Sequence, residues 1–163
     1  MSSRTIKAAV REILEEHIPA SPENGKIKIL ERYPRSLDNA YTGGLIILWA
    51  RRGTDERWAG SGQSLGPQHG VRKLTWTLLV NVINWGTAIE IDYDAFEDLQ
   101  DKILQIFRSN SSLNGRADDP AVGSQVLTFA NEMDVEEVEP QAAGKFLRYQ
   151  SVIAVKVEEI YNA

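Results

Sequence analysis

The chain of 163 residues contains no cysteine and only two histidines, His17 and His69. Without cysteine, disulfide bonds, thiolate nucleophiles and cysteine-bound metal ions are excluded. Neither histidine belongs to an H-E-x-x-H or related pattern, so a histidine-rich metal site is excluded as well. We therefore expect no metal and no other cofactor. His17 closes an amphipathic segment and is expected to interact with a helix end.

Long apolar runs are also absent. The longest, residues 45–50, is far shorter than the roughly 18 residues that a membrane-spanning helix needs. The first residues, MSSRTIKAAVREILEEH, lack the apolar core of a signal peptide. We expect a cytosolic product with no membrane partner.

The net charge of −5 hides an uneven distribution. Residues 1–82 hold 12 Lys and Arg against 8 Asp and Glu, whereas residues 83–163 hold 6 against 15, giving +4 and −9. A nucleic-acid binder carries a positive excess, so specific binding to a nucleic-acid sequence is not expected. Halves of opposite charge suit head-to-tail contacts between copies of the chain.

The apolar patterning predicts one domain over residues 1–163. Apolar stripes of helical period predict helices over residues 5–18 and 92–110, the second with a capping box at Asp94 and Glu97. Alternating or short apolar runs predict strands over residues 26–33, 45–50, 72–85, 125–139 and 146–161. The order α-β-β-β-α-β-β predicts an α+β fold, with a mainly antiparallel sheet of four to five strands and two helices packed on one face.

The expected core lies between the second helix and the longest strand. It brings the helix residues Phe96, Leu99, Ile103 and Phe107 against the strand residues Leu74, Trp76, Leu78 and Val80. The run 45–50 is expected to be buried on both faces. Trp49, Trp76 and Trp85 lie on predicted strands, so we expect them in the core.

Residues 53–70 are rich in glycine and lack periodicity, which predicts a long mobile loop and a first place to look for function. Gly60, Gly62 and Gly66 miss the dinucleotide-binding spacing by one residue, and a strand rather than a helix follows, so a phosphate cradle is not expected. Trp58 either binds a partner or folds back as a lid on the core.

Two groups of charged residues are candidates for an assembly interface. A basic group flanks the loop, as either a solvated hairpin end or a surface for the acids of a neighbouring copy. An acidic group lies on the fourth strand, with Glu132, Asp134 and Glu136 expected on one face and Met133 and Val135 on the other. These acids have three interpretations: a solvated edge that blocks strand pairing, a partner-binding arm, or a metal or catalytic site. With Trp58, the candidate interface residues are Arg51, Arg52, Arg57, Arg72, Lys73, Glu132, Asp134, Glu136, Glu137 and Glu139.

The succession of elements resembles a known family. A first helix, two strands, the long strand LTWTLLVNVIN, the helix DYDAFEDLQDKILQIF and a closing strand pair look like the tail terminator, or tail completion, proteins of tailed bacteriophages, in the version of Mu-like phages. The resemblance covers most of the chain in element order, although the acidic stretch 132–139 departs from the family pattern.

The resemblance implies a structural virion protein without catalytic residues. Its partners would be copies of itself in a hexameric ring, the tail tube that the ring caps and stops from growing, the head-side neck or connector proteins, and the sheath. It would be assembled in the host cytoplasm and reside in the tail or neck, with residues 53–70 as a candidate contact. Two alternatives stay open: another ring of the phage neck, such as a stopper or adaptor, and a small hydrolase-like enzyme that uses His69 and acidic residues.

Overall fold

The computed structural model describes residues 2–18, 27–35, 44–57, 71–86, 89–121, 123–143 and 146–162. Its helices are α1 (Ser3–His17) and α2 (Ile89–Arg108), and a short 3-10 turn, η3 (Leu113–Gly115), follows α2. Its strands are β1 (Lys28–Leu30), β2 (Leu45–Arg57), β3 (Val71–Gly86), β4 (Gln125–Ala143) and β5 (Phe146–Asn162).

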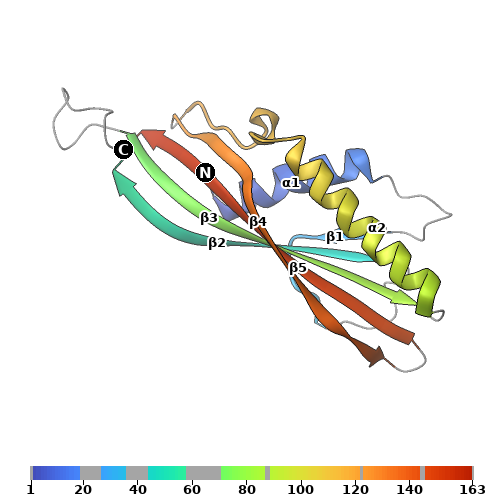
Figure 1. Ribbon diagram of the computed structural model, residues 1–163. Helices are drawn as coiled ribbons and strands as arrows, with labels where there is room; N and C mark the ends of the chain where they lie inside the picture. Colours follow the sequence, from blue (N-terminus) through green and yellow to red (C-terminus); the bar gives the residue numbers. More distant parts are fainter. Residues whose placement is uncertain are drawn as a thin grey trace.

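The five strands form one mixed sheet in the order β1-β2-β3-β5-β4. The short strand β1 is parallel to β2, and every other neighbouring pair is antiparallel. Figure 1 shows the long, strongly twisted strands with α1 and α2 on the same side of the sheet. The predicted fold class and element order are thus confirmed, and β3 and β5 form the centre of the sheet.

Helix α1 follows the predicted apolar stripe, since Ile6, Val10, Ile13 and Leu14 are all buried. At its start, the Ser2 hydroxyl accepts a hydrogen bond from the Thr5 amide at 3.3 Å, which satisfies one of the free N–H groups of the first turn. At its end, His17 Nδ1 lies 2.9 Å from the Ile13 carbonyl oxygen, so the expected contact with the helix end is confirmed.

Helix α2 begins earlier than the sequence predicts. Asp94 and Glu97 have the spacing of a capping box, but the helix starts at Ile89, so Asp94 lies inside it and the capping prediction is wrong. Acidic residues are also favourable within the first turns of a helix because they lie near its positive end. This explains why Asp94 and Glu97 resemble the first residues of a helix.

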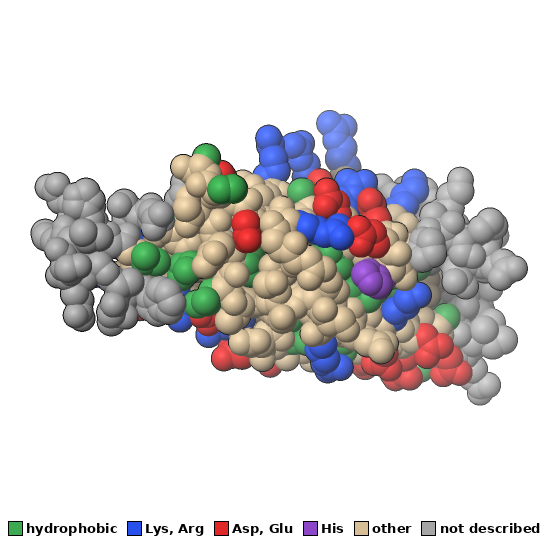
Figure 2. Space-filling view, turned by 90° about the horizontal axis from the view of Figure 1, so that it is seen from above, with side chains coloured by type: hydrophobic (Ala, Val, Ile, Leu, Met, Phe, Trp, Pro, Cys, Tyr) green, Lys and Arg blue, Asp and Glu red, His purple; other side chains and the backbone are tan. Residues whose placement is uncertain are grey.

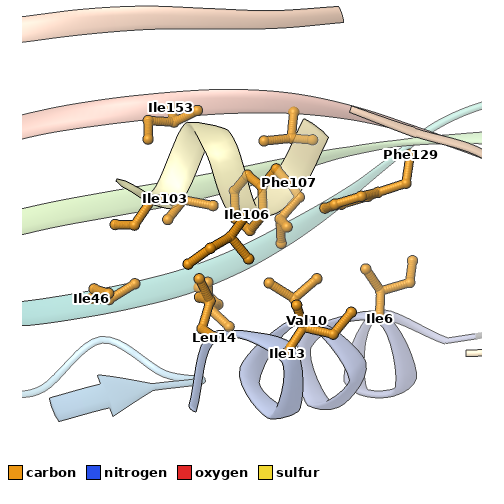
Figure 3. Packing of buried hydrophobic residues seen from close by; sticks show 14 of the residues in the cluster. Ile6, Val10, Ile13, Leu14, Ile46, Ile103, Ile106, Phe107, Phe129 and Ile153 are labelled. Atoms are coloured by element: carbon orange, nitrogen blue, oxygen red, sulfur yellow. The ribbon is translucent and has the colours of Figure 1, made fainter. Parts of the chain in front are cut away.

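The core fills the space between the two helices and the sheet. Figure 3 shows side chains of α1 and α2 pointing toward one another and toward the sheet. Phe107 and Phe129 meet edge to face with ring centroids 5.2 Å apart, which joins α2 to β4. All eight residues predicted to form the helix–strand core belong to this cluster: Phe96, Leu99, Ile103, Phe107, Leu74, Trp76, Leu78 and Val80.

The opposite face of the sheet carries a smaller apolar cluster of Leu45, Ile47, Ile83 and Trp85. Burial of β2 on both faces is therefore confirmed for its first four residues, and Trp76 and Trp85 are buried as predicted. The prediction for Trp49 is wrong, because 45% of this side chain is exposed. Trp49 lies beyond the cluster along β2, and its ring contacts that of Tyr33.

The predicted loop 53–70 starts too early, since β2 continues through Gly53 to Arg57. The register against β3 shifts between Arg52 and Asp55, which marks a bulge. A Cβ atom on Gly53 would lie 2.8 Å from the Thr75 carbonyl oxygen, so glycine here permits close backbone approach within a strand. The rest of the loop prediction, residues 58–70, lies outside the described residues.

Strands β4 and β5 form the predicted pair, but β4 continues through Pro140 to Ala143 instead of ending at Glu139. Proline is tolerated because β4 is an edge strand and the register shifts between Val138 and Gln141. A second shift lies between Phe129 and Met133, where Ala130 has a φ of 64°. The edge strand is therefore bent just before its acidic stretch.

Candidate assembly interface

The basic candidates meet at one end of the β2–β3 pair. In the register, Arg57 lies opposite Arg72 and Arg52 opposite Trp76, while Lys73 lies opposite Glu56. The guanidinium carbon of Arg52 sits 5.4 Å from the centroid of the Trp76 ring, a cation–π arrangement. Strand pairing therefore gathers all five predicted basic residues, whereas Trp58 and His69 lie outside the described residues.

Part of this basic group is neutralised within the chain. Arg72 Nε donates to Asp55 Oδ1 at 2.9 Å, and the Tyr161 hydroxyl donates to Asp55 Oδ2 at 2.8 Å. Hydrogen bonds from Arg72 and Tyr161 hold the pKa of Asp55 below its usual value. Burial and the bond to Asp55 raise the pKa of Tyr161. Arg72 is thus paired with Asp55 at this end of the sheet.

Lys73 belongs to a row of alternating charges that crosses the sheet. Its Nζ lies 2.8 Å from Glu158 Oε2, and Lys156 Nζ lies 3.1 Å from Glu158 Oε1. Lys156 also approaches Glu132 Oε1 at 3.7 Å. The hydrogen bonds from Lys73 and Lys156 lower the pKa of Glu158, and the bond to Glu158 together with the Glu132 charge raises the pKa of Lys156. Among the acidic candidates, Glu132 thus approaches a cationic side chain.

The acidic candidates lie on β4 and their faces follow the prediction. Asp134 and Glu136 pair with Ala154 and Val152, on the face away from the helices, whereas Met133 and Val135 pair with the core residues Val155 and Ile153. Glu137 pairs with Ser151 and shares the helix-covered face. All five acidic candidates are exposed: Glu132, Asp134, Glu136, Glu137 and Glu139.

The outer edge of β4 is covered only in its first part. The Phe129 amide donates to the Ser111 carbonyl oxygen at 2.7 Å, and the Val126 amide donates to Asp118 Oδ1 at 2.9 Å. The segment after α2 therefore occupies the edge up to Phe129. Beyond the bulge at Ala130, no strand in the described part of the chain pairs with the outer side of β4.

The outer edge of β2 is arranged in a similar way. Strand β1 pairs with Leu45, Ile46 and Ile47 only. From residue 48 to residue 57, β2 has no strand neighbour on its outer side among the residues with described structure. Arg51, Arg52 and Arg57 lie on this stretch, together with Asp55 and Glu56, and all five side chains are exposed.

The fold keeps the basic and acidic groups apart. Strands β3 and β5 separate β2 from β4, and Figure 1 shows the ends of β2 and β4 at opposite ends of the sheet. On the helix-covered face, seen in Figure 2, acidic and basic side chains lie close to one another. The separation of charge is therefore a property of the two sheet edges rather than of that face.

An exposed aromatic pair, Tyr33 and Trp49, is not predicted from the sequence. Tyr33 is 51% exposed and Trp49 45%, and their ring centroids lie 5.7 Å apart. Asn81 Nδ2 donates to the Tyr33 hydroxyl at 2.8 Å and fixes the pair over β3. By strand alternation, Arg51 lies on the same face as Trp49. The adjacent arginines at positions 51 and 52 were a sequence indication that β2 leaves the core near Trp49.

Two further grooves border β4. One groove between α2 and β4 is lined by Leu104, Arg108, Met133 and Val135, and a second includes Tyr93, Phe96, Glu137 and Glu139. Within the described ranges, no group of three or more His, Asp or Glu side chains is placed to hold a metal ion. In the same ranges, neither helix combines the length and apolar character needed to cross a membrane.

A comparison of the sequence with protein-family models finds no match, and a search among curated proteins finds none either.

Proposed function

We propose that this protein is a structural component that works by assembling with copies of itself, as a ring-forming tail terminator of a bacteriophage. In this role it caps the tail tube, stops its polymerisation and offers a face to the head-side neck or connector proteins. The ring would be a hexamer within the tail or neck of the virion, assembled in the host cytoplasm. No catalytic step is part of this proposal.

The observation that carries the proposal is the opposite charge of the two sheet edges. A closed ring needs a heterologous interface, in which one patch meets a different patch on the next copy. The open part of β2 holds three arginines against two carboxylates, and residues 132–139 of β4 hold five carboxylates. The sheet order supports the proposal because it places these stretches on opposite sides of the molecule.

Another ring of the phage neck, a stopper or adaptor, would use the same edges and differ in its partner. Particles made without this protein distinguish the two roles. Abnormally long tails are expected for a terminator, whereas normal tails with unattached heads would assign the protein to another part of the neck. Particles with normal tails and attached heads would contradict both roles.

The self-association can be tested on the purified chain. Contacts between exposed charges weaken as salt screens them, so we expect an oligomer in sedimentation at low salt that dissociates at high salt. Assembled tail tube is added in a parallel series, because binding to the tube raises the local concentration of the chain. A monomer at every concentration and salt, with and without tube, would contradict the proposal.

The small-enzyme alternative makes a different prediction. It requires His69 together with the acidic residues, so His69→Ala would abolish an activity and leave assembly unchanged. The ring proposal predicts little effect of His69→Ala on tail length and a large effect of deleting residues 58–66.

A further inference from the structure

The two open sheet edges offer a specific way of joining the copies. An unpaired edge strand presents a row of backbone N–H and C=O groups that can pair with another strand. In each copy, residues 48–57 of β2 and the part of β4 beyond Phe129 have no strand neighbour on their outer side within the described structure. One copy therefore carries two such edges, one on each side of its sheet.

We propose that the open edge of β2 in one copy pairs antiparallel with the open, acidic edge of β4 in the next copy, so that the sheet continues from copy to copy. The partner is a second copy of this chain. This proposal rests on the self-assembly proposed above and adds the strands, their direction and the residues that select them.

The direction follows from the sheet. Strand β2 is antiparallel to β3, β3 to β5, and β5 to β4, so β4 runs opposite to β2. When a second copy is added with its helices on the same side, its β2 lies beside β4 of the first in the antiparallel sense.

The lengths of the two open stretches are also compatible with pairing, as are the positions of the segments that cover the rest of each edge. The open stretch of β2 has ten residues, positions 48–57, which is comparable with the eight residues of the acidic stretch 132–139. Strand β1 ends its pairing at Ile47, and the segment after α2 ends its contact with β4 at Phe129. The charged residues of both edges thus lie within the open stretches.

The side chains are complementary on the face away from the helices. Trp49 and Arg51 lie on this face of β2, and Asp134 and Glu136 lie on the same face of β4. In a continuous sheet, side chains of neighbouring strands on one face lie about 4.5–5.5 Å apart at Cβ, within reach of an ion pair. The exposed indole of Trp49 would then be covered by the neighbouring copy.

The opposite interpretation of the same acids is that they keep the edge from pairing at all. The two interpretations predict opposite changes in self-association when these acids are neutralised. If the acids attract the arginines of a neighbour, Asp134→Asn with Glu136→Gln weakens association. If they only repel other strands, the same change promotes association or precipitation, and the proposal is overturned.

A charge exchange in the full-length chain gives the sharper test. We expect Arg51→Glu to weaken self-association by about tenfold or more, as measured by sedimentation at low salt. Asp134→Lys with Glu136→Lys should do the same. The chain carrying all three changes should regain association within a few-fold of the wild type, because the interface again joins opposite charges.

Matched controls keep the charge change and move it elsewhere. Lys102→Glu, and Asp98→Lys with Asp101→Lys, alter exposed residues of α2 away from both edges and should leave association unchanged. Circular dichroism of each variant monitors folding. A control pair that weakens association as strongly as the edge variants would overturn the proposal, since net charge rather than the edges would then matter.

Backbone pairing between β2 of one copy and β4 of the next is measured separately, by amide hydrogen exchange. On assembly, peptides covering residues 48–57 and 132–139 should exchange more slowly, whereas peptides from the exposed side of α2 should not change. If closed rings form and neither edge gains protection, edge pairing is wrong while the proposed function stands. If the wild-type chain remains a monomer with and without tail tube, both are overturned.

Discussion

Trp76 and Glu159 are joined inside the protein: the indole Nε1 donates to Glu159 Oε1 at 2.8 Å, and both side chains are buried. The other carboxylate oxygen accepts from the Ser124 hydroxyl at 2.9 Å. One glutamate of β5 therefore ties the central strand β3 to the beginning of the edge strand β4. A buried carboxylate is stable only when its oxygens are hydrogen-bonded, so this contact fixes the position of β4 on the sheet.

Replacing this carboxylate should destabilise the fold. Glu159→Ala leaves the Trp76 N–H and the Ser124 hydroxyl without their acceptor, and each buried unpaired group costs about 1–3 kcal/mol. We expect the free energy of unfolding to fall by roughly 3 kcal/mol in urea denaturation. Glu159→Gln keeps one acceptor oxygen and should lose less. Asp101→Ala, at an exposed position of α2, is the control, and an equal loss in that variant would contradict the role given to Glu159.

The carboxyl of Asp55 should titrate below its ordinary pKa of about 3.9. A lowered folded-state pKa stabilises the protein above the unfolded pKa, and that stabilisation disappears as the pH falls through the folded value. The carboxyl carbon shift in an NMR titration measures this pKa directly. Arg72→Ala should raise it because the main hydrogen bond is lost. An unchanged pKa in that variant would show that the ion pair does not persist in solution.

Ile103 tests the packing of α2 on the sheet. Its side chain is 0% exposed and lies within the core shown in Figure 3. Ile103→Ala should lower the free energy of unfolding by roughly 2–5 kcal/mol, since the change removes buried methyl groups and leaves a cavity. The exposed neighbour Lys102 provides the control, and Lys102→Ala should change stability by less than about 0.5 kcal/mol. Similar losses in both variants would contradict the assigned helix face.

Gly53 tests the bulge that lets β2 continue to Arg57. Gly53→Ala places a Cβ about where the Thr75 carbonyl oxygen approaches, at 2.8 Å, and the backbone must shift. We expect a loss of about 1–3 kcal/mol, as for overpacking elsewhere. Amide exchange at residues 51–57 should become faster while exchange in α1 stays the same. A loss spread evenly over the chain would argue against a local bulge.

Several elements could be predicted because their patterns are local. In α1, Ile6, Val10, Ile13 and Leu14 recur with the helical period, and each is buried. In β3, alternate residues from Leu74 to Val82 face the core as the alternation indicates. These predictions needed only the direction in which successive side chains point along a helix or strand.

Element ends were predicted less well. The acids near Asp94 suit any position in the first turns of α2, so they could not fix its first residue. Gly53 looks like a loop residue in the sequence, yet it lies in a strand because β3 approaches its backbone closely. Trp49 is a large apolar residue within an apolar run, which is typical of a core position. Its exposure depends on where the smaller apolar cluster, on the face away from the helices, ends along β2.

The sequence by itself determined the number, kind and order of the elements, and it identified the charged groups at both edges, since periodicity and composition are local properties. Only the tertiary structure decided the strand order, which places β4 and the outer half of β2 at separate edges and buries Glu159 between β3 and Ser124. These features arise from pairing between residues far apart in the chain. No local pattern encodes that pairing, because it depends on which whole faces fit together when the core is formed.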